Sequence, residues 1–553
     1  MLKRKSILFV LIAMLVVATA CSSNEETGKK STGENGDVFT YTFFNASSTG
    51  KDVNTGDTKI GKMFEEATGV NFDIEYIVGD SNQKIGTMIA SGEYPELLNA
   101  QNATSDVIDA GGFVPLNDLI EEHAPNLRKL YDPIWERMKQ EDGNIYILPS
   151  GVSNGYIKPP NIGQSAFWIK RDALKEQGYP HPKTIDEFFE IVEEYAKAHP
   201  TTDDGAKTIP YTLLQYDWHV GQLFDPPAFL SGEQEGIIVD NETLEVSVYH
   251  NKDITKRWLK ILNEVNDKGL LDKESFTQNL DEYLAKISSG RVVGWFGPRW
   301  ESGSALDSLE QDDDPYNDFM GFPIVFEEGI KDQYLNPVSY VTSPGMGLTT
   351  GTSEEDQIRI IKFLDHMAKE ESQKLITWGI EGETYEVNEE GRFYRTEEQL
   401  ELVSNQEFED EFGFSALGWY WPIMSGVFDD GNSVDPAVQP EVAQLAYDEA
   451  DKEFLEAYGI ETFTDIFTEP EPAPWFPFWD ATIETGSEAQ LYDQQSRDLI
   501  KRSYPDIILA NPSDFDAQWN KFKQEFDKLP YEAYEDVIEA TVKRETELTN
   551  VDN

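Results

Sequence analysis

Apolar and polar residues alternate along the chain with two different periods. VFTYTFFN (38–45) alternates aromatic and polar residues, which predicts a β-strand, because successive strand side chains point to opposite faces. DTKIGKMFEEATGVNFDIEYIV (57–78) predicts a helix followed by a second strand. QKIGTMIASGEYPELLNAQ (83–101) and VIDAGGFVPLNDLIEEH (107–123) continue this alternation of helical and extended pieces. The pattern therefore predicts an α/β fold.

Later segments carry helix start signals. Thr184 and Glu187 predict a capping box at the start of TIDEFFEIVEEYAKAH, whose apolar residues recur on one helical face. Thr352 and Glu355 predict the same arrangement ahead of QIRIIKFLDHMAKE. Near the end of the chain, a helical apolar stripe is interpreted as core packing rather than a binding face. Its members are Trp519, Phe522, Phe526 and Leu529.

The first 20 residues have the pattern of an export signal. Three basic residues at 3–5 precede an apolar run at 7–17, which is too short to span a bilayer comfortably. Small residues at 18–20 then precede Cys21, the only cysteine of the chain. The arrangement resembles a bacterial lipoprotein signal, in which the cysteine becomes the acylated first residue of the mature protein. The alternative is an ordinary secreted protein that is cleaved nearby and keeps Cys21 as a free thiol.

Lipidation would attach the protein to a membrane without a transmembrane helix. Each buried methylene of an acyl chain contributes about 0.8 kcal/mol, so several chains on Cys21 give a stable anchor. Residues 21–37, CSSNEETGKKSTGENGD, contain no large apolar residue and predict a flexible tether between the lipid and the folded part.

Composition and charge narrow the classes of function. The chain has 103 acidic and 45 basic residues and a formal net charge of −58. Such a surface argues against binding to nucleic acid or to an anionic membrane surface, because phosphates require a basic face. It is interpreted as a solubilising surface. At 12% aromatic residues the chain still forms a core, and its length predicts two large domains.

Motifs for catalysis and for metal binding are not found in the sequence. It contains no GxSxG, no Walker loop and no HExxH, and its six histidines have no metal-ligand spacing. Neighbouring carboxylates carry little information in a chain this acidic. The stretch FDDGNSVDP (428–436) has oxygen donors suited to calcium but lacks a full loop pattern, so it is interpreted as turns. We therefore expect no catalytic residue, no cofactor and no metal ligand.

Tryptophans gather in segments that glycine and proline interrupt. Such segments usually run over the surface, where flat indole faces suit the apolar faces of sugar rings. Polar residues beside them can bond sugar hydroxyls, and the alternative for any one cluster is core packing. The clusters are YDWH (216–219), WFGPRW (295–300), GWYWP (418–422) and PWFPFW (474–479).

Five segments, taken in order, resemble bacterial extracellular solute-binding proteins of family 1, the receptors of sugar ABC importers. The last segment is typical of the large lipoprotein branch of Gram-positive bacteria, which is similar to alginate-oligosaccharide-binding proteins. The segments are FWIKRDALKEQGYPHPKTIDEFFEIVEEYAK (167–197), NDKGLLDKESF (266–276), ISSGRVVGWFGPRW (287–300), VTSPGMGLTTGTSEEDQIRIIKFLDHMAKEE (341–371) and WGIEGETYEVNEEGRFY (378–394).

The resemblance implies a two-lobed periplasmic-binding-protein-like fold of type II. Its ligand lies in a cleft between α/β lobes that close around it. Lobe 1 would comprise residues 38–150 and 340–400, and lobe 2 residues 151–339 and 401–553.

The resemblance also implies ligand-binding residues. Gln101 and Asn102 match sugar-contacting positions of the first lobe, and Trp218, Trp295, Arg299 and Trp300 match cleft-facing loops of the second, with Trp421 as a further candidate. HPTTDDGAKTIP (199–210) matches a calcium loop of the alginate-binding relatives but lacks most of its ligands.

The sequence thus predicts a lipid-anchored, monomeric receptor on the extracellular face of the cell membrane. It would capture a carbohydrate, in particular an oligosaccharide, deliver it to ABC importer permease subunits, and catalyse nothing. The alternatives are a surface glycoside hydrolase or polysaccharide lyase, and a peptide-binding importer receptor.

Overall fold

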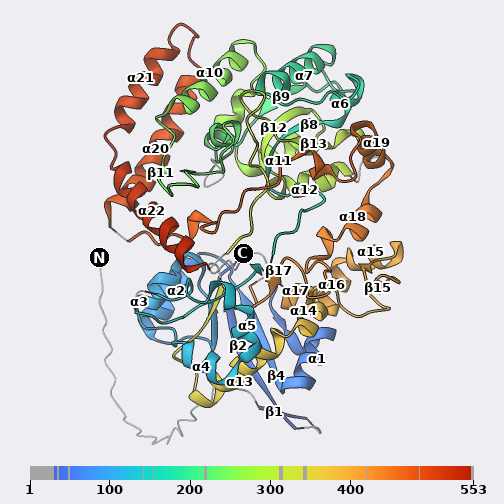
Figure 1. Cartoon of the computed structure of the whole chain (residues 1–553), viewed down its shortest axis with the longest axis vertical. Coiled ribbons are helices and arrows are strands. Elements are labelled where there is room, and N and C mark those ends of the chain that lie inside the picture. The colour runs from blue at the N-terminus through green and yellow to red at the C-terminus, as the bar shows by residue number, and fades with distance from the viewer. Residues whose placement is uncertain are drawn as a thin grey trace, which may run out of the picture.

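The structure is a computed structural model in which the chain forms two α/β lobes, one above the other in Figure 1. It describes residues 30–549 except 34–35, 48–49, 141, 154, 217–220, 311–314, 341–344, 419 and 485. Cys21, most of the predicted tether and Trp218 therefore lie outside the described residues. Within the described part, no helix has the length and apolar character needed to cross a membrane.

Lobe 1, the lower lobe of Figure 1, is built on a mixed sheet in the order β3-β4-β2-β5-β14-β6, with β1 paired to β2. β2 runs parallel to β4 and to β5. β1 lies within the segment predicted as a tether. The strands are β1 (Lys30–Gly33), β2 (Gly36–Asn45), β3 (Val53–Asn54), β4 (Val70–Tyr76), β5 (Leu97–Asn99), β6 (Leu148–Pro149) and β14 (Gly345–Leu348).

Strand alternation divides the side chains of this sheet between two cores. Phe43 of β2 and Leu97 of β5 face one core, and Phe44 and Leu98 face the other. α1, α4, α5 and α13 cover the first face, and α2 and α3 cover the second. Their bounds are α1 (Lys59–Thr68), α2 (Ser81–Ser91), α3 (Thr104–Asp109), α4 (Asn117–His123), α5 (Pro125–Leu130) and α13 (Glu354–Met367).

Local signals set the ends of these helices. The Thr58 side chain accepts from the Gly61 amide to start α1, and Gly69, at φ 72°, ends it so that β4 can begin. The predicted capping box of Thr184 and Glu187 is confirmed in lobe 2. The predicted box at Thr352 is wrong by one residue, because Ser353 caps α13 by accepting from the Asp356 amide.

Lobe 2, the upper lobe of Figure 1, is built on a sheet in the order β13-β8-β12-β9. Its strands are β8 (Ser165–Lys170), β9 (Ile209–Thr212), β12 (Val292–Pro298) and β13 (Phe319–Phe322). Its helices are α6 (Arg171–Glu176), α7 (Ile185–Ala198), α8 (Gly221–Phe224), α9 (Pro226–Leu230), α10 (Asp253–Asp267), α11 (Leu280–Ser288), α12 (Arg299–Glu310), α19 (Glu449–Tyr458), α20 (Glu488–Ile508), α21 (Phe515–Phe526) and α22 (Tyr531–Leu548).

Aromatic contacts hold the core of lobe 2 together. The Phe167 ring of β8 packs edge-on against Phe188 of α7 at 5.1 Å and against Trp258 of α10 at 6.1 Å. Trp519, Phe522 and Phe526 of α21 belong to the same core, which confirms that their stripe serves packing.

The segment from 381 to 446 belongs to lobe 1, so the predicted assignment of residues 401–446 to lobe 2 is wrong. Phe412, Leu417 and Trp421 are buried in the lobe 1 core, because this segment folds back onto α1 and the sheet instead of continuing upward. Its elements lie beside lobe 1 in Figure 1. They are β15 (Glu386–Val387), β16 (Phe393–Tyr394), α15 (Glu397–Val403), α16 (Gln406–Phe412), α17 (Phe414–Leu417), β17 (Met424–Ser425) and α18 (Pro440–Ala446), and α14 (Glu370–Thr377) precedes them.

The chain passes between the lobes where β7 (Val152–Ser153) leads to β8, where β13 leads to β14, and where α18 leads to α19. The segment before α20 also reaches the boundary, because the Phe476 carbonyl accepts from the Tyr340 amide at 3.2 Å. These connections bring several parts of the chain together between the two sheets.

Candidate functional site

Polar residues end three neighbouring strands of lobe 1. Asn45, Tyr76 and Asn99 are the last residues of β2, β4 and β5, which run parallel and therefore end at the same edge of the sheet. In open α/β sheets, ligands bind in the crevice outside the carboxyl ends of the strands. This edge, which we call the polar edge, is therefore the candidate ligand surface of lobe 1.

The protein provides hydrogen-bond partners for the oxygen of the Asn99 side-chain amide but not for its nitrogen. Its Oδ1 accepts from the Gln101 backbone amide at 3.1 Å and from Gln101 Nε2 at 2.9 Å. Its Nδ2 is buried and has no hydrogen-bond partner among the described residues. A buried donor without a partner costs about 1–3 kcal/mol, and the fully buried Asn99 side chain places that cost at the polar edge.

Two residues beside the polar edge have a left-handed backbone. Gln101 has φ 50° and Tyr420 has φ 81°, a region that is costly for residues with a Cβ. Such conformations cost on the order of 1–3 kcal/mol and cluster at ligand sites. The Tyr420 hydroxyl donates to Ser47 Oγ at 2.7 Å, which ties the 418–422 segment to the end of β2. Predicted residues Gln101 and Asn102 therefore lie directly after the polar edge, on the short helical turn Gln101–Ala103.

Lobe 2 places aromatic residues after its own parallel strands. β9 and β12 run parallel, and their carboxyl ends lead to Tyr216 and to Trp300. Both side chains are about half exposed, at 46% and 56%. The Trp300 amide donates to the Gly163 carbonyl at 3.3 Å, which fixes the start of α12 against the segment that enters from lobe 1. Trp300 therefore lies at the lobe boundary with a solvent-accessible face.

Trp295 and Trp421, in contrast, are core residues. Trp295 of β12 is fully buried and stacks on Trp168 at 5.2 Å, because helices and loops cover both faces of this central strand. Trp421 is buried in lobe 1, where its Nε1 donates to the Ala416 carbonyl at 3.0 Å. Neither indole has a face to offer a ligand, so these two predictions are corrected. Trp218 stays a prediction, since it lies outside the described residues.

Arg299 has a different environment from its neighbour Trp300. Its guanidinium lies over the Trp168 ring at 5.9 Å and its NH1 is 3.9 Å from Asp318 Oδ1. The side chain is about three-quarters buried. Arg299 therefore lines the interior of lobe 2, while Trp300, one residue on, is exposed.

Several site candidates were not found from the sequence. Asn45, Asn99 and Tyr420 become site candidates only in the folded structure, where the ends of β2, β4 and β5 lie side by side. Tyr156, in the segment entering lobe 2, is 37% exposed and its pKa is raised to about 12 by partial burial and then by Glu469. Trp479 is 48% exposed and follows Phe476 of the boundary segment. The PWFPFW cluster is the sequence signal that points to Trp479.

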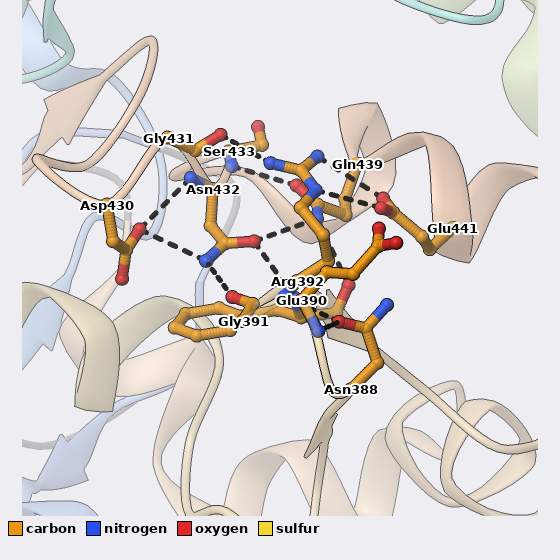
Figure 2. Close-up of polar contacts among 11 residues, drawn as sticks. Asn388, Glu390, Gly391, Arg392, Asp430, Gly431, Asn432, Ser433, Gln439 and Glu441 are labelled. Atoms are coloured by element: carbon orange, nitrogen blue, oxygen red, sulfur yellow. Dashed lines mark hydrogen bonds and ion pairs between the residues drawn. The ribbon is translucent and has the colours of Figure 1, made fainter.

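The FDDGNSVDP loop is a structural connection, as Figure 2 shows. Asn432 Nδ2 donates to the Gly391 carbonyl at 2.9 Å and its Oδ1 accepts from the Phe393 amide at 2.9 Å. Asp430 accepts from the Asn432 amide and pairs with Lys374 at 2.7 Å. Asn432 Oδ1 also accepts from Nε2 of Gln439, the residue before α18, at 3.1 Å. The loop thus ties the β15–β16 hairpin to the start of α18, which confirms the interpretation as turns. Among the described residues, no group of three or more His, Cys, Asp or Glu side chains is placed to hold a metal ion.

Comparisons with known proteins agree on one family. Residues 59–380 match the family model described as bacterial extracellular solute-binding protein. The fructooligosaccharide ABC transporter substrate-binding protein FusA of Streptococcus pneumoniae is 27% identical over 319 residues, 55% of this chain and 59% of that protein. The polygalacturonan/rhamnogalacturonan-binding protein YtcQ of Bacillus subtilis is 22% identical over 61% of this chain and 66% of its own length. The matches thus span about three-fifths of the length of these relatives.

Solved structures show the same fold over nearly the whole chain. FusA of S. pneumoniae in complex with kestose aligns with a TM-score of 0.64 and 19% identity, covering 91% of this chain and 99% of that one. An extracellular solute-binding protein from Bifidobacterium longum subsp. infantis aligns with a TM-score of 0.63 and 15% identity, covering 93% and 100%. The two-lobed fold predicted from the sequence is confirmed.

Proposed function

This chain belongs to the bacterial extracellular solute-binding proteins, and we propose that it captures an oligosaccharide between its lobes and delivers it to an ABC importer. The observation that carries the proposal is the polar edge of lobe 1, with an unpartnered buried amide at Asn99, at the strand ends where such folds bind ligands. Relatives described as binding fructooligosaccharide and polygalacturonan or rhamnogalacturonan support a carbohydrate as the ligand.

The two lobes would contribute different chemistry to the ligand. The Tyr76 hydroxyl of the polar edge, with Gln101 and Asn102, would bond the sugar hydroxyls. Trp300, Tyr216 and Tyr156 are partly exposed aromatic residues, and their rings would stack on the apolar faces of sugar rings. A sugar that touches both lobes binds the closed state better than the open state, so binding would shift the population toward closure. Because capture needs no bond to break, we propose no catalytic step.

A ligand screen tests this function. We expect an oligosaccharide from a panel including kestose, maltotriose and a galacturonic acid trimer to raise the melting temperature. A ligand present at a hundred times its dissociation constant adds about 2.7 kcal/mol to the free energy of unfolding. Small-angle scattering of the same sample should show a smaller radius of gyration, because the lobes close. If short peptides stabilise the protein and the oligosaccharides do not, the peptide-receptor alternative replaces this proposal.

We also propose that Cys21 carries the lipid that holds the protein at the extracellular face of the cell membrane, where it acts as a monomer. Replacing Cys21 with Ser removes the acylated sulfur, so the variant should leave the membrane fraction and accumulate in the medium or as uncleaved precursor. Cell fractionation and immunoblotting measure this directly. A variant in which a distant surface serine, Ser308, becomes Ala serves as the control and should stay with the membranes. Membrane association of Cys21→Ser equal to that of the wild type would contradict the anchor.

A further inference from the structure

Lobe 2 contains a cavity of about 360 Å³ between its sheet and α19. The residues around it include Trp168, Arg171, Arg299, Asp318 and Tyr447. The volume is at the lower end of the range for small-molecule sites, about 300–1,000 Å³. The cavity is thus large enough for a compact ligand, and the walls carry both charged and aromatic groups.

Two charged side chains of the cavity have unused hydrogen-bonding capacity. Asp318 is 4% exposed, and its Oδ1 lies 3.9 Å from Arg299 NH1 but has no hydrogen-bond partner among the described residues. Arg171 is 6% exposed and pairs with Asp451 at 2.6 Å and Asp318 at 3.3 Å, yet its Nε is unpartnered. Burial alone would lower the pKa of Arg171, but the adjacent carboxylates of Asp318 and Asp451 raise it overall. A charged group buried this deeply is normally fully hydrogen-bonded.

The balance of charges indicates which ligand the cavity suits. The cavity wall contains two guanidiniums, from Arg171 and Arg299. It also contains three carboxylates, from Asp318, Asp448 and Asp451. A free anion or a free cation would therefore meet like charges on one side of the cavity. A neutral molecule with many hydroxyl groups can accept from the guanidiniums and donate to the carboxylates at once. Asn161 and the Tyr447 hydroxyl add further polar groups at the wall.

We propose that this cavity is a second ligand site, which takes one neutral sugar unit of monosaccharide size. This site differs from the interlobe site because most of its walls belong to lobe 2, and the rest come from two connecting segments that contain Asn161, Ala446 and Tyr447. The Tyr447 hydroxyl bonds Asn161 Oδ1 at 3.3 Å, and the Thr464 amide donates to the Pro160 carbonyl at 3.3 Å. Binding here therefore does not require the lobes to close.

A blocking variant tests the site with little risk to the fold. Ala446 lines the cavity, is exposed and ends α18, so Ala446→Phe places a bulky ring at the wall without entering a core. Ala437→Phe is the matched control, because Ala437 is also exposed but does not line the cavity. Asn161→Ala is a second, milder variant that removes one polar wall group.

Calorimetric titration with glucose, galactose, mannose, fructose and arabinose is the measurement. We expect one of them to bind the wild type with 1:1 stoichiometry and no change in the radius of gyration. Ala446→Phe should weaken this binding at least about tenfold and Asn161→Ala by less, while Ala437→Phe and Trp300→Ala leave it unchanged.

Two results would overturn the second site. One is that no monosaccharide of the panel binds, which indicates a water-filled cavity. The other is that binding survives Ala446→Phe but is lost in Trp300→Ala, which assigns it to the interlobe site. Oligosaccharide binding measured on the same samples separates the proposals. If it persists, only the second site fails, and if it is absent as well, the proposed function fails.

Discussion

Arg137→Met is expected to lower the free energy of unfolding by about 3–5 kcal/mol. Arg137 of lobe 1 is fully buried and forms an ion pair with Glu545 of α22, itself 5% exposed. Its NH1 also donates to the Pro474 carbonyl and to Thr549 Oγ1, both at 3.1 Å. The substitution leaves the buried Glu545 carboxylate with Arg544 as its cation partner, a side chain that is 53% exposed, and the loss of the buried cation is the reason for the large cost. The Arg137 contacts join lobe 1 to the end of α22 and to the boundary segment. Losing the Arg137 side chain should therefore also loosen the contact between the lobes.

Denaturant unfolding of three variants separates the ion pair from packing. The double variant Arg137→Met with Glu545→Met removes both charges, so it should recover most of the lost stability. Lys256→Met breaks an exposed pair in which Nζ lies 2.7 Å from Asp516, and it should cost less than about 1 kcal/mol. A single Arg137→Met variant as stable as Lys256→Met would show that the buried pair contributes little.

Trp295→Ala and Trp300→Ala are expected to have opposite effects, although the two residues are five positions apart. Trp295 packs between Trp168 and Phe319 in the core of lobe 2, with ring centroids at 5.2 and 6.0 Å. Truncating a core tryptophan costs about 3–5 kcal/mol, so the ligand-free protein should melt much earlier. Trp300 is 56% exposed, and its loss should change the melting temperature of the ligand-free protein little.

The two substitutions should affect ligand affinity in the opposite order, with the larger loss in Trp300→Ala. If Trp300 stacks on the sugar, Trp300→Ala removes about 1–3 kcal/mol of binding energy, by analogy with bases stacked on aromatic side chains. That loss corresponds to a roughly ten- to hundredfold weaker affinity, measured by calorimetry with the oligosaccharide found in the screen. Trp295→Ala should bind that sugar nearly normally wherever it is still folded. A Trp300→Ala protein with unchanged affinity would remove Trp300 from the site.

Local patterns in the sequence were sufficient for the secondary structure and the family. The alternation in VFTYTFFN defines a strand because each residue's face depends only on its neighbours, and β2 spans Gly36–Asn45. The Thr184 capping box is likewise a contact across three residues. At α13 two adjacent hydroxyl residues were available, and the sequence pattern selected Thr352 where the helix uses Ser353. Gln101 and Asn102 lie on the short turn after β5, and their contact with a sugar stays a prediction from the resemblance.

The tertiary structure decided which aromatic residues are exposed and which lobe each segment joins. WFGPRW contains one core tryptophan and one exposed tryptophan, and only the elements packed around β12 and the start of α12 distinguish them. Residues 401–446 joined lobe 1 through contacts with residues far away in the sequence, such as Tyr420 with Ser47. The polar edge and the cavity of lobe 2 also arise where distant segments meet. Burial and pairing depend on what covers a side chain, and a one-dimensional pattern does not contain that information.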